Sequence, residues 1–271
     1  MGWFPFYQPL KRPRRFQVIA HRGMMRRAPE NTKPALELAI EAGIEWVEVD
    51  VRLTGDGYHV LMHSSLLDKT TDGKGLVEEH TIAQIKRLDA GSWFSPRYAG
   101  ERVLSLEECL DLAYRRINLY LDCKRVNPRL LVGQILRAGM QDQVVVFGKL
   151  ELLRQIRALS NGEIAIMPKW WPKYGLDAWL DDVQPNAVEI NADVITPEIC
   201  RAFHGREIYV QAKTLGEWDR PDIWDKMLRA KVDWIQTDMP EELITYGLKR
   251  EEENERTSDP RGQTGCYGRK P

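Results

Sequence analysis

Two histidines and two acidic residues stand at the ends of strand-like stretches in the first quarter of the chain. His21 follows the apolar run Val-Ile-Ala, Glu48 and Asp50 alternate with valines, and His63 follows Val-Leu-Met. Polar groups at the ends of buried strands are costly unless they bind something. If these strands converge, two imidazoles and two carboxylates share one cleft, which suits metal-assisted acid–base chemistry on an anionic substrate.

A third acid far along the chain strengthens this interpretation. Glu48 and Asp50 are two residues apart and therefore share one face of a strand. Asp122 ends the run Asn-Leu-Tyr-Leu-Asp, and Lys124 lies on the same face two residues later. Three converging carboxylates could hold one hard cation, which takes oxygen ligands. The two acids of the first pair could also simply form ion pairs with basic neighbours, namely Arg22, Arg52 or Lys124.

The two histidines flank the acidic strand, which favours an acid–base pair over two structural histidines. We expect His21 and His63 to fill these roles. Arg22 and Lys124 would then hold an anion, arginine through its planar fork and lysine as a point charge. The other three histidines are interpreted as surface or loop residues, namely His59, His80 and His204.

Aromatic residues occur at two further places. Trp170 and Trp171 follow a predicted strand at 164–167 and could form a wall for an apolar or choline-like group. They could equally pack over the rim of the fold. The segment 3–7, Trp-Phe-Pro-Phe-Tyr, precedes four basic residues between 11 and 15 and could make a weak contact with a membrane surface.

Strand-like and helical patterns alternate along most of the chain, which predicts a parallel sheet with helical crossovers. We expect strands at 17–20, 46–53, 58–62, 118–123, 144–147, 164–167, 187–190, 207–211 and 234–236. We expect helices near 33–43, 81–88, 105–115, 128–138, 149–159, 175–182, 197–203, 217–230 and 240–248.

One strand too many is present for an eight-stranded barrel, and a hairpin resolves the excess. Only Thr-Gly-Asp-Gly at 54–57 separates the second strand from the third, which is too short for a parallel crossover and suits a tight turn. The third strand is therefore a return strand at the barrel mouth. The sequence predicts an α/β fold, a (β/α)8 TIM barrel with a small insertion after a β-hairpin. A doubly wound open sheet is the alternative, but no glycine-rich phosphate loop follows the first strand.

The expected organisation is one catalytic domain and a tail. We expect residues 1–248 to form the barrel domain, with an insertion at about 64–104 that contains one helix. We expect residues 249–271 to form a charged, disordered tail, whose first residues either extend the last helix or fray from it.

Composition limits the function classes. The chain of 271 residues has a net charge of −1, which argues against nucleic-acid binding. No apolar run reaches membrane-spanning length, and no signal peptide is evident. The four cysteines lack the paired spacing of a disulfide framework or zinc site. We therefore expect a cytoplasmic protein, and the sequence does not indicate its oligomeric state.

The candidate residues lie in motifs that resemble those of the glycerophosphodiester phosphodiesterase family. The match is dense over the first half and runs from about 18 to 245. Its motifs are His-Arg-Gly at 21–23, Ala-Pro-Glu-Asn-Thr at 28–32, Glu-Val-Asp-Val at 48–51, Val-Leu-Met-His at 60–63, Leu-Asp-Lys-Thr-Thr at 67–71, Leu-Asp-Ala-Gly-Ser-Trp-Phe at 88–94, Leu-Glu-Glu at 106–108, Asp-Cys-Lys at 122–124 and Gln-Thr-Asp-Met-Pro at 236–240.

The resemblance implies a (β/α)8 barrel that hydrolyses glycerophosphodiesters to glycerol 3-phosphate and an alcohol with one Mg²⁺ or Ca²⁺, a reaction of lipid metabolism. It implies these roles: His21 and His63 as acid–base pair, Glu48, Asp50 and Asp122 as metal ligands, and Arg22 and Lys124 as phosphate contacts. The sequence departs from the family pattern at Ser64 and Asp122, where Asp and Glu are usual, and at Gln211, where Trp is frequent. Two alternatives stay open: lysophospholipase D-type activity on lysolipids, and a barrel that binds a phosphodiester without turnover.

Overall fold

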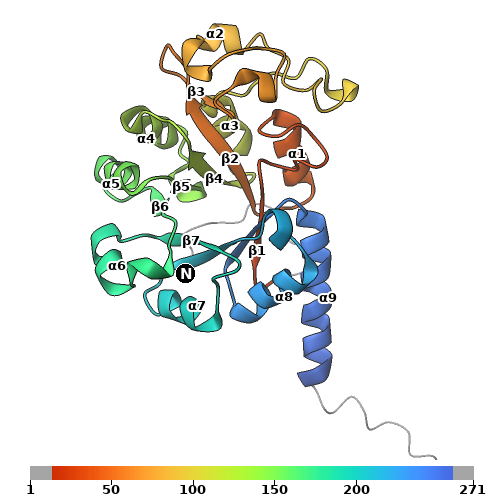
Figure 1. Cartoon of the computed structure of the whole chain (residues 1–271), viewed down its shortest axis with the longest axis vertical. Coiled ribbons are helices and arrows are strands. Elements are labelled where there is room, and N and C mark those ends of the chain that lie inside the picture. Colours follow the sequence, from red (N-terminus) through yellow and green to blue (C-terminus); the bar gives the residue numbers. More distant parts are fainter. Residues whose placement is uncertain (1–13, 259–271) are drawn as a thin grey trace, which may run out of the picture.

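Eight parallel strands form a nearly closed barrel with helices on its outside (Figure 1), which confirms the predicted fold class. The computed structural model describes residues 14–258. Around the barrel the strands follow the order β6-β5-β4-β2-β1-β9-β8-β7. Their bounds are Gln17–Ala20 for β1, Trp46–Leu53 for β2, Asn118–Cys123 for β4, Val144–Phe147 for β5, Ala165–Met167 for β6, Ala187–Asn191 for β7, Tyr209–Lys213 for β8 and Trp234–Thr237 for β9.

The barrel closes between β6 and β7 without a regular ladder. This seam is a single bridge between Lys169 and Glu189 with backbone hydrogen bonds on either side. Glu189 N–H donates to the Pro168 carbonyl at 3.0 Å, and Trp170 N–H donates to the Glu189 carbonyl at 2.9 Å. Because a proline has no backbone N–H to donate, Pro168 shortens the pairing at this point.

The short strand β3 (His59–Leu61) returns antiparallel along β2, as the hairpin argument predicts. The turn is closed by hydrogen bonds from Thr54 N–H to the Tyr58 carbonyl and from Gly57 N–H to the Thr54 carbonyl. Gly57 has a φ of 86°, which glycine adopts without steric cost. The hairpin brings the segment after β3 back to the carboxyl end of β2.

Helices cover the outside of the barrel, and several begin at a side-chain cap. Their bounds are Lys33–Glu41 for α1, Ile82–Ile85 for α2, Leu106–Ala113 for α3, Pro128–Arg137 for α4, Leu150–Leu159 for α5, Asp177–Val183 for α6, Pro197–His204 for α7, Pro221–Ala230 for α8 and Pro240–Ser258 for α9. Capping boxes begin α2 at Thr81 and α3 at Ser105, and the Thr196 hydroxyl caps α7 by accepting from Ile199 N–H. No helix in residues 14–258 has the length and apolarity needed to span a bilayer.

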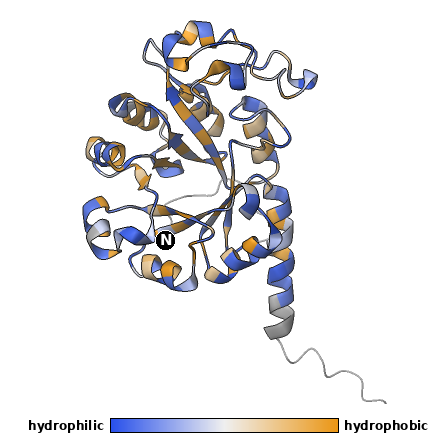
Figure 2. Ribbon diagram, viewed as in Figure 1, coloured by the Kyte–Doolittle hydropathy of each residue, from blue (hydrophilic) through white to orange (hydrophobic). Residues whose placement is uncertain are grey.

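Alternate residues of the strands pack into two different apolar layers. In β2, Val47, Val49 and Val51 face the helices, whereas Trp46 points into the barrel. Figure 2 shows the resulting alternation of hydrophobic and hydrophilic bands along β2. Trp46 and Trp234 meet inside the barrel with ring centroids 4.7 Å apart. This apolar floor leaves the carboxyl ends of the strands as the place where polar side chains gather.

The insertion after β3 carries α2 and forms its own small apolar cluster beside the barrel (Figure 1), with Val60, Val77 and Ile85 at its centre. At the other end of the chain, α9 continues through the segment predicted as a disordered tail as far as Ser258. Arg250 holds this extension, since it pairs with Asp225 of α8 at 2.8 Å and with Glu253 at 2.7 Å. Residues 259–271 lie outside the described residues.

Two further expectations are corrected. The strand predicted at 207–211 runs instead from Tyr209 to Lys213, because Glu207 has a φ of 58° and belongs to the turn after α7. His59, expected at the surface, is 1% exposed on β3 and hydrogen-bonded between β3 and α4. The aromatic residues of the N-terminal segment lie outside the described residues, whereas Arg14 pairs with the buried Glu45.

Candidate active site

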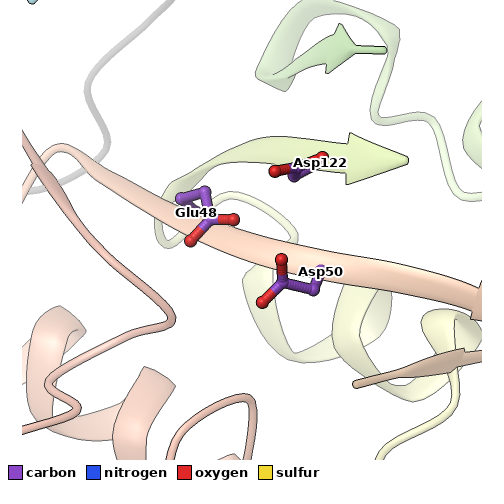
Figure 3. Close-up of side chains that lie close together, drawn as sticks. All are labelled: Glu48, Asp50 and Asp122. Atoms are coloured by element: carbon purple, nitrogen blue, oxygen red, sulfur yellow. The ribbon is translucent and has the colours of Figure 1, made fainter. Parts of the chain in front are cut away.

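Three carboxylates gather at the carboxyl ends of β2 and β4 (Figure 3). Glu48, Asp50 and Asp122 each place an oxygen within 4.8 Å of the others. Parallel pairing sets Asp50 directly beside Asp122, and Glu48 lies two residues earlier on the same inward face of β2. The alternation seen in the sequence is therefore enough to bring the three acids together.

The electrostatics of this acidic cluster fit a divalent cation. Burial, followed by the charges of Asp50 and Asp122, raises the pKa of Glu48 well above its ordinary value. Burial also raises the pKa of Asp122, although the neighbouring Lys124 opposes this. Glu48 is 2% exposed and Asp50 is 1% exposed. Carboxylate oxygens crowded in this way are the donors that Mg²⁺ and Ca²⁺ prefer.

Two basic side chains border the acidic cluster. Lys124 Nζ lies 2.5 Å from Asp122 Oδ2 and 3.1 Å from Asp50 Oδ1. Arg22 Nε lies 3.3 Å from Asp50 Oδ2, and Arg22 Nη1 donates to both carboxylate oxygens of Glu30 at 2.9 and 3.0 Å. The ion pairs considered as an alternative from the sequence thus exist for Arg22 and Lys124, at the edge of the same cluster.

The residues Arg22 and Asn31 adopt a left-handed backbone that sequence reasoning did not anticipate. Arg22 has a φ of 52°, and its N–H donates to Glu48 Oε2 at 2.9 Å. Asn31 has a φ of 59°, and its side chain donates to Asp50 Oδ2 at 2.9 Å while accepting from Asp50 N–H at 3.0 Å. Such conformations persist where surrounding contacts fix them. Asn31 positions Asp50, although only its place in a motif singled it out.

His21 stands between two carboxylates. Its Nδ1 lies 2.6 Å from Asp238 Oδ1, and its Nε2 lies 3.9 Å from Glu48 Oε2. A carboxylate on Nδ1 fixes the ring so that Nε2 faces the acidic cluster. Asp238 follows β9 within the motif at 236–240, and its role beside His21 depends on the neighbouring position of β1 and β9.

His63 follows β3 and faces the same end of the barrel. The charges of Asp50, Arg22 and Lys124 act on its ring, which lines a small pocket together with Asn31. Burial, the largest influence, lowers the pKa of His63 to about 4. The ring is therefore neutral at neutral pH. The segment is held by Arg52, whose guanidinium donates to the His63 carbonyl at 2.8 and 3.0 Å.

The predicted wall of Trp170 and Trp171 is wrong for Trp170. This residue is 6% exposed and packs edge-on against Phe203 of α7 with ring centroids 5.3 Å apart. Its indole N–H donates to the Gly175 carbonyl at 3.2 Å. Strand alternation turns Trp170 toward the helices, because Lys169 before it points inward. Trp171 is half-buried, and the Lys169 ammonium lies 4.8 Å from its ring centroid.

Ser64 replaces the acid expected after the second histidine and has a local role. Its hydroxyl accepts a hydrogen bond from Leu66 N–H at 2.9 Å, which shapes the chain entering the insertion. The position of His63 therefore rests on Arg52 and on the hydrogen bond from Met62 N–H to the Asp50 carbonyl at 2.9 Å.

Comparison with known proteins agrees with this arrangement. Residues 21–130 match the model of the glycerophosphoryl diester phosphodiesterase family. A glycerophosphodiester phosphodiesterase of Caldanaerobacter subterraneus subsp. tengcongensis is 32% identical over 246 residues, which cover 86% of this chain and 98% of that protein. A glycerophosphodiester phosphodiesterase of Bacillus subtilis is 41% identical over 120 residues, which cover 41% of each chain.

Solved structures show the same likeness. The glycerophosphodiester phosphodiesterase of Agrobacterium tumefaciens superposes with a TM-score of 0.73 at 27% identity, covering 83% of this chain and 97% of that one. A phosphodiesterase of Oleispira antarctica, solved in complex with the product sn-glycerol-3-phosphate, gives a TM-score of 0.74 at 28% identity and covers 85% and 96%. A match of this length, in sequence and in fold, means that the chain belongs to the glycerophosphoryl diester phosphodiesterase family and is a phosphoric diester hydrolase.

Proposed function

We propose that this protein hydrolyses glycerophosphodiesters to glycerol 3-phosphate and an alcohol in a metal-dependent reaction with a two-histidine acid–base pair. The observation that carries the proposal is the convergence of His21 and His63 on the acidic cluster of Glu48, Asp50 and Asp122. The product complex of the Oleispira antarctica relative supports the substrate class.

The acidic cluster would hold one Mg²⁺ or Ca²⁺. Bound there, the cation would neutralise the nonbridging phosphate oxygens and make phosphorus a better electrophile. Lys124 and Arg22 would contact the same phosphate from the edge of the acidic cluster, since each already lies within 3.3 Å of a carboxylate oxygen there. With these charges in place, a phosphodiester monoanion would enter a site that offsets its own charge.

We assign the two histidines different roles. His63 is neutral at neutral pH because burial lowers its pKa to about 4, so it can accept the proton of the group that attacks phosphorus. That group is either water, or a glycerol hydroxyl whose cyclic phosphate product water would then open. The Nδ1 of His21 lies 2.6 Å from Asp238, which turns Nε2 toward the acidic cluster, so we assign His21 the delivery of a proton from Nε2 to the leaving alcohol oxygen.

Release of glycerol 3-phosphate from glycerophosphodiesters tests the proposal. We expect activity to require added Mg²⁺ or Ca²⁺ and to vanish with chelator. His21→Ala and His63→Ala should each lower kcat by about 10²–10⁴-fold, whereas His80→Ala in the insertion should retain it. Chelator-insensitive turnover, or full activity of His21→Ala, would contradict the scheme. Release of choline from lysophosphatidylcholine would instead indicate lysophospholipase D-type activity, and binding without product would indicate a non-catalytic barrel.

Two sequence-based expectations stay proposals. We propose that residues 1–248 form one catalytic domain and that the aromatic and basic segment before Phe16 makes a weak contact with membrane surfaces. Co-sedimentation of the full chain with anionic vesicles, compared with a chain lacking residues 1–13, tests the second proposal.

A further inference from the structure

Opposite the acidic cluster, the strands β6 to β8 bring a second polar group to the barrel mouth. Lys169 stands two residues beyond the inward-facing Met167, Glu189 two beyond the inward-facing Ala187, and Lys213 four beyond the inward-facing Tyr209. Because side chains alternate along strands, all three point to the inside of the barrel. We call Lys169, Glu189 and Lys213 the second polar group.

Glu189 is fixed in place and connects this group to the acidic cluster. The Tyr120 hydroxyl donates to Glu189 Oε2 at 2.8 Å, and Tyr120 lies two residues before Asp122 on β4. The other oxygen, Oε1, lies 3.3 Å from Lys169 Nζ but accepts no hydrogen bond within the described chain. The contact with Lys169 is therefore ionic, and the N–H groups of Lys169 remain available to a ligand.

The ammonium of Lys169 occupies the place where a choline group would bind. It lies 4.8 Å from the centroid of the Trp171 ring, the distance at which a quaternary ammonium is attracted to an aromatic face. Trp170 offers no second face, because it is buried against Phe203. A cationic ligand would meet a like charge here, so the geometry disfavours choline.

Lys213 adds a second donor of the same charge. It is half-buried at the end of β8, between Asn191 of β7 and Gln236 of β9, and its ammonium makes no hydrogen bond or ion pair with any of residues 14–258. Two lysines and one carboxylate give the second polar group a net positive charge. Its reachable atoms are mainly N–H donors, which seek oxygen acceptors.

We infer that the second polar group binds the alcohol portion of the substrate and selects glycerophosphodiesters of uncharged polyols, such as glycerophosphoglycerol, over those of choline. The inference rests on the proposed function and names the substrate class of the same site. Hydroxyl groups match the site because each can accept a hydrogen bond from a lysine, whereas a trimethylammonium group offers no acceptor.

Comparison of kcat/KM for glycerophosphoglycerol and glycerophosphocholine tests the inference. We expect the wild type to favour the polyol. Lys213→Met leaves no partner unpaired. It should lower the ratio of kcat/KM for glycerophosphoglycerol to kcat/KM for glycerophosphocholine by about 10-fold, the loss typical of one charge-assisted hydrogen bond. Lys173→Met is the matched control. Lys173 lies on the loop that carries Lys169, with its ammonium 5.2 Å from the centroid of the Tyr174 ring, and its replacement should leave the ratio unchanged.

A double variant gives an independent arm. Lys169→Met with Glu189→Gln removes both charges of the ion pair, so no buried carboxylate is left alone, and frees the face of Trp171. We expect it to shift the ratio further toward glycerophosphocholine. An unchanged ratio in both variants would overturn the inference. An equal fall for both substrates would do the same, since it would place the lysines at the shared phosphate or glycerol. Failure of the wild type to hydrolyse either diester would instead refute the proposed function.

Discussion

Asn31 fixes the position of Asp50, a proposed metal ligand, through two simultaneous hydrogen bonds. Its amide donates to Asp50 Oδ2 and its carbonyl accepts from Asp50 N–H. We predict that Asn31→Asp keeps the left-handed backbone and the acceptor but replaces the donor with a second negative charge. The result should be a fall in kcat/KM of at least about 10-fold with the fold retained, measured by kinetics and by circular dichroism.

Asn161→Asp is the control for this change. Asn161 also has a left-handed backbone, with a φ of 49°, but lies in the turn after α5, away from the barrel mouth. Equal activity of the two variants would show that the hydrogen bonds of Asn31 do not orient Asp50.

At the residue scale, the sequence was enough to place the acidic side chains whose direction depends only on alternation along a strand. Glu48 and Asp50 share a face because they are two residues apart, and Asp122 ends a strand that pairs with theirs. Asp238 was not identified as the partner of His21, since the two are 217 residues apart and meet only when the barrel closes. Trp170 was misplaced because its predicted position ignored the alternation that continues through Lys169.

At the scale of elements, His59 ties the return strand β3 to α4. Gln134 Oε1 lies 2.7 Å from its Nδ1, and Asn127 N–H donates to its Nε2 at 3.0 Å, so the ring is held neutral. Burial lowers the pKa of His59 below its ordinary value. Below an ordinary pKa of about 6.5 the unfolded chain binds a proton that the folded chain resists, so stability falls as the pH falls.

We predict that replacing His59 removes part of this pH dependence. His59→Gln should flatten the fall in melting temperature between pH 7.5 and pH 5, with each fully titrating group contributing up to about 1.4 kcal/mol per pH unit. His80→Gln, which replaces a histidine of the insertion, is the matched control. Thermal melts across this pH range provide the measurement, and an unaltered slope in His59→Gln would exclude His59 as a source.

The insertion depends on one close backbone approach at Gly91. A Cβ there would lie 1.9 Å from the Tyr98 carbonyl oxygen, so a side chain requires the loop to move. We predict that Gly91→Ala lowers the melting temperature. Gly133→Ala in α4, where only the flexible end of Arg137 is near, should have no destabilising effect because alanine favours a helix. Similar melting temperatures for the two variants would contradict this.

Element boundaries were less predictable than element types. The strand expected at 207–211 was two residues early, because the left-handed Glu207 extends the preceding turn and nothing in the apolar pattern indicates its φ. The shift matters for function, since it places Lys213 at the carboxyl end of β8. The hairpin at 54–57, in contrast, was predictable from its length alone.

At the scale of the whole molecule, the three carboxylates of the acidic cluster repel one another. A bound cation would reduce this repulsion and stabilise the folded chain. We predict that saturating Mg²⁺ or Ca²⁺ raises the melting temperature by on the order of 5 °C, since a ligand at 100 times its Kd stabilises by about 2.7 kcal/mol. Differential scanning calorimetry provides the measurement, and potassium chloride at matched ionic strength is the control. Asp50→Asn should lose most of the shift, and an equal shift with potassium chloride would point to general screening instead.

The architecture as a whole followed from counting strands and from one short turn, as the strand order confirms. The place where the barrel closes did not, because closure depends on how the two edge strands of the curved sheet, β6 and β7, meet in space. Pro168 was visible in the sequence, but a proline after a strand indicates only where a ladder weakens.

The seam between β6 and β7 lies on a different part of the barrel wall from the acidic cluster. The acidic cluster is built on β2 and β4, which share a continuous ladder, whereas Lys169 and Glu189 sit on the one stretch where that ladder is interrupted. Substitution of Lys169 therefore disturbs few backbone hydrogen bonds and leaves the opposite wall intact, whereas Glu189 is tied to that wall by the Tyr120 hydroxyl of β4. The proposed alcohol specificity can therefore change, in evolution or by design, while the proposed catalytic residues on the opposite wall stay the same.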